Sequence, residues 1–142
     1  MTPFASPEVA AKFAGYPPEA RRRLLALREL VFRTAAETPG AGDIAESLKW
    51  GEPAYATKNR NGSPLRIDWK PKSPAQYAMY FQCQTSLVGT FRTLFPHDFG
   101  FEGNRALVFA LQAKPPRDAL QLCIAAALTY HVNKRTSATT RP

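Results

Sequence analysis

The stretch Leu48-Lys49-Trp50-Gly51-Glu52-Pro53-Ala54-Tyr55 places two large aromatic residues and a carboxylate at a point where the chain must turn. Just upstream, Asp43-Ile44-Ala45-Glu46 has the spacing of a capping box, in which the first acid caps a helix and the second reaches back. Gly51 suits the left-handed position after a last helical turn, and Pro53 prevents the helix from resuming. We therefore expect a helix from Asp43 to Trp50, a forced turn, and a short strand from Pro53 to Thr57.

The length and composition predict one globular domain. A chain of 142 residues can bury a sizeable core, and 44% apolar residues with 11% aromatics exclude a disordered chain. No run approaches the roughly 20 apolar residues that a membrane span needs, and the first residues do not have the pattern of a secretory signal. Cys83 and Cys123 lie too far apart for a redox pair, so we interpret both thiols as structural. A cytoplasmic location is the expectation.

The net charge of +8 raises the alternative of nucleic-acid binding. Lys134, Arg135 and Arg141 fall in a polar C-terminal tail, so they add little to the charge of the folded body. The densest basic stretch of the body runs from Lys58 to Lys72, and no helix-turn-helix, zinc finger or RNA-recognition motif accompanies it. A solvated basic surface is therefore the favoured interpretation, and nucleic-acid binding through this stretch is the alternative.

The remaining elements predict an α+β fold. We expect a short helix from Pro7 that stops at Gly15, in a segment 1–15 that precedes the main domain of residues 16–135, and a frayed tail over 136–142. Within the domain, hydrophobic periodicity and turn residues place helices and strands in a mixed order. The helices are expected over 17–37, 43–50, 85–95 and 115–134, and the strands over 53–57, 65–70, 76–82 and 106–111. This order is typical of a small, mainly antiparallel sheet with helices packed on it.

The helix over 17–37 has an apolar arc that is unusually wide and that includes Arg21 and Arg28. Three interpretations remain open for these arginines. Their stems pack while their heads reach water, a carboxylate meets them inside the protein, or one of them faces a ligand.

The turn segment 48–55, together with Arg28 in a Leu-x-x-Leu-Arg helix, resembles the YdhG-like family, known as domain of unknown function 1801. The aromatic strand 77–81 and the run 102–107 before a proline-opened last helix extend the resemblance over about residues 16 to 133. The resemblance implies a compact bacterial cytosolic α+β domain. Some relatives in that family are described as frataxin-like iron chaperones, which makes iron binding an alternative function.

The residues themselves give little support to iron binding or catalysis. An iron site needs several oxygen ligands on one face, and the best local group, formed by Asp43, Glu46 and Glu52, includes two residues already assigned to a helix cap. No zinc-ligand spacing, nucleophile elbow or phosphate-binding glycine loop occurs. We therefore expect neither a cofactor nor a metal site, and a protein that is not an enzyme.

A small anionic ligand or a protein partner, bound near the turn between Trp50 and Tyr55, is the leading hypothesis for function. Aromatic side chains with polar tips are typical of concave binding sites, and arginines can anchor an anion. The apolar last helix could also extend a homodimer interface. The candidate site residues are Arg28, Trp50, Glu52, Tyr55, Arg66, Trp69, Tyr80 and Arg105.

Overall fold

The computed structural model describes residues 1–133, which form an α+β domain with one antiparallel sheet. The chain runs through α1 (Pro7–Ala14), α2 (Pro18–Glu37), β1 (Ile44–Lys49), β2 (Glu52–Thr57), β3 (Leu65–Asp68), β4 (Gln76–Phe81), α3 (Leu87–Leu94), β5 (Gly100–Glu102), β6 (Ala106–Ala110) and α4 (Arg117–Leu128). The predicted fold class is confirmed. None of the described helices is long and apolar enough to cross a membrane.

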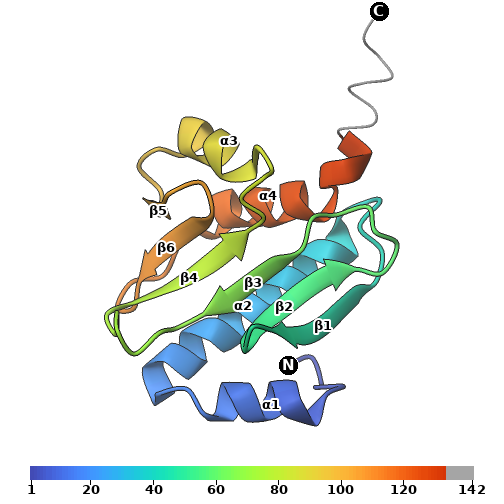
Figure 1. The fold of residues 1–142 in the computed structure, drawn as a ribbon. Coiled ribbons are helices and arrows are strands. Elements are labelled where there is room, and N and C mark those ends of the chain that lie inside the picture. The colour runs from blue at the N-terminus through green and yellow to red at the C-terminus, as the bar shows by residue number, and fades with distance from the viewer. Residues whose placement is uncertain (134–142) are drawn as a thin grey trace, which may run out of the picture.

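The sheet has six strands in the order β1-β2-β3-β4-β6-β5, and every neighbouring pair is antiparallel. Figure 1 shows α2 and α4 behind one face of the sheet, with α1 below, while the face toward the viewer carries none of these helices. We call this uncovered side the open face. The sheet is therefore one layer of a two-layer domain whose main core lies between the strands and the helices.

Alternation along the strands separates the two faces. In β4, Tyr77, Met79 and Phe81 belong to the main core, whereas Ala78 and Tyr80 form a separate small cluster on the open face. The helix layer contributes large apolar side chains from every helix, among them Phe13, Leu24, Leu27, Phe91 and Leu120. Because side chains in a strand point to alternate sides, this pattern fixes which residues can reach a ligand on either face.

The first two helices begin where the sequence predicts. The Ser6 side chain accepts a hydrogen bond from the Val9 amide at 3.3 Å, which caps α1, and Pro7 occupies the first helical position. Since α1 buries Val9 and Phe13 in the main core, the N-terminal helix is part of the same packed body as the rest of the described chain.

The predicted helix over residues 43–50 is wrong. Residues Ile44–Lys49 form strand β1, which pairs with β2 in a hairpin whose two-residue loop is Trp50-Gly51. Both loop residues have positive φ, 52° and 76°, as the tight turns favoured in hairpins require. The Glu46 carboxylate does not cap a helix; it accepts hydrogen bonds from Arg28 and Tyr55. A distant partner thus outweighs the local capping signal.

Three further differences concern shorter segments. Residues 100–102, expected as loop and turn, form the edge strand β5, and the strand expected over 65–70 ends at Asp68. The last long helix, α4, ends at Leu128, and after a turn at Thr129 residues 130–133 are helical again. The end expected for it near Lys134 and the tail 136–142 lie outside the described residues.

Gly62, in the connection between β2 and β3, provides a test of this packing. A Cβ atom at Gly62 would lie 2.6 Å from the Leu128 carbonyl oxygen and 2.7 Å from its Cα atom. We expect Gly62→Ala to lower the free energy of unfolding by about 2 kcal/mol, because backbone of α4 must move to admit the methyl group. Urea unfolding followed by circular dichroism measures the change.

The matched control is Gly89→Ala in α3, where the added Cβ would have only an ordinary contact, 3.8 Å from Asn104 Oδ1. This variant should be neutral or more stable by about 0.5–1 kcal/mol, since alanine favours a helix over glycine. Equal effects of the two substitutions would contradict the predicted close packing of the loop on α4.

Candidate ligand-binding site

The candidate residues divide between the two faces of the sheet. Arg28 in α2 and Tyr55 in β2 lie in the helix-covered core, both with no exposed surface. Glu52, Arg66 and Tyr80 lie on the open face, where the register pairs Arg66 directly with Tyr80. The structure therefore does not bring the eight predicted residues into one pocket.

Arg28 forms a buried ion pair and has no hydrogen-bond donor left for a ligand. Its Nε and Nη2 atoms donate to the two oxygens of Glu46 at 2.6 and 3.0 Å, and the hydroxyl of Tyr55 donates to the same carboxylate at 2.8 Å. The other three N–H groups meet the carbonyls of Thr2 and Pro3 and the carboxylate of Glu29. Of the three interpretations, the internal carboxylate is therefore correct for Arg28.

Arg21 also has a structural role. Its guanidinium donates to the carbonyl oxygens of Phe13, Ala14 and Tyr16, at distances of 3.0–3.2 Å. These carbonyls belong to the end of α1 and the residues after it, where a helix leaves acceptors without partners. Arg21 thus joins the first helix to the second.

On the open face, Glu52 is the centre of a charge cluster. The carboxylate forms salt bridges with Arg66 and with Lys70, whose Nζ atom lies 2.6 Å from Oε2. Lys70 also lies 3.0 Å from Asp68, which in turn accepts a hydrogen bond from the hydroxyl of Tyr16. Burial lowers the pKa of Lys70, but the hydrogen bonds to Glu52 and Asp68 raise it by more than burial lowers it. The net shift of the pKa is upward, so the ammonium stays charged.

Aromatic rings flank the cations of this cluster. The Cζ atom of Arg66 lies 4.7 Å from the centre of the Trp50 ring and 5.4 Å from that of Tyr80. Arg105 approaches Tyr80 at 5.5 Å. Trp69 is not part of this group, because its indole N–H donates to the Pro74 carbonyl at 3.0 Å and its ring packs on the main core.

A hollow of about 210 Å³ opens beside Trp50 on the open face. Trp50 itself is 86% exposed. The residues that give the hollow its chemistry are Ser47, Lys49, Trp50, Ala54, Arg66 and Gln82. Lys49 forms no ion pair among the described residues, and Arg66 uses a single nitrogen for Glu52. The hollow therefore combines an apolar lining, the ring of Trp50, an ammonium group without an ion pair among the described residues, and a guanidinium that is paired with Glu52.

Residues 1–133 offer no metal site, and their buried thiol is not activated. That part of the chain has no group of three or more His, Cys, Asp or Glu side chains that could hold a metal ion. Glu46 and Glu52, both named in the iron alternative, lie on opposite faces of the sheet, since Glu46 pairs with Tyr55 and Glu52 with Lys49. Burial raises the pKa of Cys123 to about 12, so its thiol stays protonated and unreactive.

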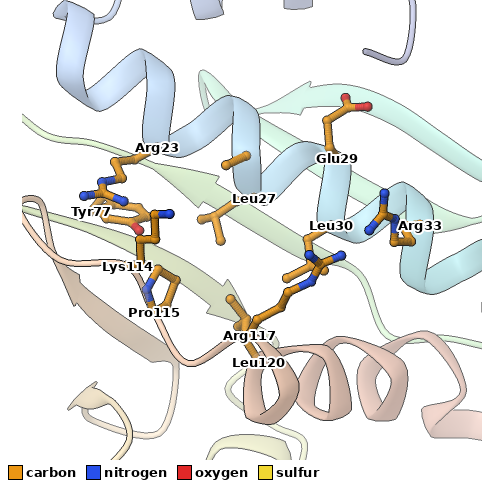
Figure 2. A pocket seen from close by; sticks show the side chains of 11 residues that line it. Arg23, Leu27, Glu29, Leu30, Arg33, Tyr77, Lys114, Pro115, Arg117 and Leu120 are labelled. Carbon is orange, nitrogen blue, oxygen red and sulfur yellow. The ribbon is translucent and has the colours of Figure 1, made fainter.

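The sequence analysis missed a second and larger pocket, of about 370 Å³, between α2, α4 and β4. Figure 2 shows Arg23, Lys114 and Tyr77 together at one end, and Arg33 and Arg117 toward the other. One sequence signal pointed to it. Arg117 stands at the first position of a helix, where the helix dipole disfavours a cation, so its placement there needs a reason other than helix stability.

Two buried tyrosines, Tyr55 and Tyr16, are expected to make the protein less stable at alkaline pH. Burial raises the pKa of Tyr55, and the Glu46 carboxylate raises it further; burial and Asp68 do the same for Tyr16. Because an unfolded tyrosine ionises near pH 10, the stabilisation by these protonated hydroxyls is complete below about pH 10 and is lost as the pH rises above it.

We expect Tyr55→Phe to make the fall in the free energy of unfolding above pH 10 shallower, by up to about 1.4 kcal/mol per pH unit. Urea unfolding between roughly pH 9 and 11 measures it, and identical slopes in the two proteins would refute the assignment.

A comparison with family models, with curated proteins and with solved structures finds no match to this chain. The resemblance to the YdhG-like family therefore stays a prediction from the residues that carry it. What the site does must be argued from its own geometry.

Proposed function

We propose that this protein is a non-catalytic binding protein for a small aromatic anion, which it holds in the hollow beside Trp50. The observation that carries the proposal is the state of Trp50, which is a large apolar side chain with 86% of its surface exposed and a left-handed backbone. The left-handed backbone costs stability and the exposed indole gains none from burial, so a contact with a ligand would explain why a tryptophan occupies this position.

The backbone supports this argument because other residues suit the position better. Asparagine followed by glycine is the preferred pair for such a hairpin loop, and a residue with a bulky side chain at positive φ is uncommon. Trp50 nevertheless occupies the first loop position, with φ 52°. An indole ring in this place offers a rigid, flat surface of the kind on which planar ligands stack.

The neighbours of Trp50 complement a planar ring that carries an acid. Arg66 stacks on the indole at 4.7 Å and extends the flat surface, while Lys49 lines the hollow with a positive charge that forms no ion pair with the described part of the chain. Ser47 and Gln82 add hydroxyl and amide groups that can bond to the edge of a ring. Nucleotides and aromatic carboxylates share this chemistry and are the ligand class that we favour.

The charge cluster beside the hollow prepares the site for binding. Glu52 pairs with Arg66, Lys70 pairs with Glu52, and Asp68 pairs with Lys70, so the guanidinium is fixed before a ligand arrives. Fixing a side chain in its bound position reduces the entropy that binding would otherwise cost. Compared with the site expected from the sequence, the proposal retains Trp50, Glu52 and Arg66 and leaves out Arg28 and Trp69. Tyr55 lines the hollow, but its hydroxyl is used by Glu46. Tyr80 and Arg105 lie against each other beside Arg66 and do not line the hollow.

The two alternatives have less support in the described residues. Iron delivery has no ligand cluster in them. Nucleic-acid binding through Lys58–Lys72 loses two of its cations to internal salt bridges, since Arg66 and Lys70 are paired with Glu52 and Asp68. A steep fall of affinity with salt would nevertheless distinguish that function from the one proposed here.

Binding is tested by fluorescence in the Trp69→Phe background, where Trp50 is the only tryptophan of the chain. Adenosine monophosphate and naphthoate should quench the emission saturably, and adenosine, which lacks the charge, should bind more weakly. Lys49→Gln should weaken binding of both anions about fivefold, as expected for one exposed ion pair of about 1 kcal/mol. If neither anion quenches saturably at millimolar concentration, the proposal is wrong.

Trp50→Asn separates function from stability. The variant should lose ligand binding, measured by calorimetry, because the stacking surface is gone. Its stability should rise by about 0.5 kcal/mol, since relief of about 1 kcal/mol of backbone strain exceeds the loss of an exposed cation–π contact of about 0.5 kcal/mol. A variant that binds as the wild type does, or that is clearly less stable, would contradict the role given to Trp50.

A further inference from the structure

The pocket between α2, α4 and β4 carries a charge pattern that the site beside Trp50 does not use. Its volume is about 370 Å³, and its floor is apolar, with Leu27 and Leu30 from α2 and Leu120 from α4. Four cations border it, namely Arg23, Arg33, Lys114 and Arg117. Figure 2 shows them divided between the two ends of the apolar floor.

The protein itself does not neutralise these cations. Among the described residues, Arg33, Lys114 and Arg117 form no ion pair. Arg23 forms one long salt bridge, with Glu19 at 3.6 Å, and its Nε atom donates to the Leu111 carbonyl at 2.9 Å, which leaves its two terminal nitrogens for the pocket. The one carboxylate at the pocket, Glu29, is already held by the amide and hydroxyl of Thr2, both at 2.8 Å, and by Arg28. The pocket therefore concentrates positive charge, which a bound anion would neutralise.

Tyr77 adds a hydrogen-bond donor to this pocket. Its residue is buried as a whole, but its hydroxyl forms no hydrogen bond with the described part of the protein and is not among the buried polar atoms that lack a partner. Figure 2 shows this side chain at the pocket end that contains Arg23 and Lys114. Because Tyr77 lines the pocket and uses its hydroxyl for no internal bond, this donor is available to an acceptor inside the pocket.

We infer that this pocket binds a linear organic dianion, one with an acid group at each end of an apolar chain, such as an α,ω-dicarboxylate. One acid group would meet Arg23, Lys114 and the hydroxyl of Tyr77, and the other Arg33 and Arg117. The ten residues from Arg23 to Arg33 correspond to about 15 Å along α2, and side chains that lean inward shorten the span between the charges. A chain with a single acid would leave one pair of cations unmatched.

Calorimetry with octanedioate and decanedioate, set against octanoate and decanoate, tests the inference. The dianions should bind at least tenfold more tightly than the monoanions of the same length. Lys114→Gln and Arg33→Gln, which change exposed residues at opposite ends, should each reduce dianion affinity toward that of the monoanion. Arg60→Gln, at an exposed arginine of the connection between β2 and β3, is the matched control and should have no effect.

The result can be separated from the site beside Trp50. Trp50→Asn should keep full dianion affinity, because Trp50 does not line this pocket. Equal affinity for dianions and monoanions, no binding of either at millimolar concentration, or binding that both Lys114→Gln and Arg33→Gln leave unchanged would each overturn the inference.

Discussion

The first half of the structure depends on one constraint, which is the burial of the positively charged guanidinium of Arg28 away from water. An unpaired charge in that position would cost several kcal/mol, and each of its five N–H groups has an acceptor. Those acceptors come from the N-terminal segment, from α2 itself and from β1. The rings of Phe4 and Phe32, at 3.9 and 5.1 Å, cover the guanidinium. One side chain thereby joins three segments that are distant in the sequence.

The ion pair between Arg28 and Glu46 also determines which side chains lie on the open face. Because Glu46 must face the helices to reach Arg28, the alternation of the strand turns Ser47 and Lys49 outward. The two-residue loop then places Trp50 at the end of the hairpin, beside Arg66 from β3. A slip of one residue would expose Glu46 and bury Lys49, and both charges would lose their environment. The hollow on one face thus follows from the burial of a charge on the other.

The elements that the sequence predicts correctly are those with a local signal. Serine and proline mark the start of α1, and continuous hydrophobicity marks β6. The failure over 43–50 has an instructive cause, because Asp43 and Glu46 have the spacing of a helix cap while Ile44, Glu46 and Leu48 also alternate as in a strand. The choice is made by Arg28, eighteen positions before Glu46, and by hairpin pairing with β2. Local propensity is a weak prior when a partner lies so far away.

The same reasoning explains how far the site could be predicted. An arginine within an apolar arc left three interpretations open for Arg28, and an internal carboxylate partner was one of them. The sequence did not identify Glu46 as that partner. The sequence analysis missed the larger pocket because two of its cations come from α2 and the other two, Lys114 and Arg117, from the segment that leads into α4. These groups are more than 80 residues apart in the sequence, and only the folded chain brings them together. Strand β4 shows how one scaffold serves two environments. Its Tyr77 faces the helix pocket and its Tyr80 the open face, three positions apart and hence on opposite sides of the sheet. Since this parity cannot change without moving the whole strand, the two binding surfaces are fixed by a single pairing register.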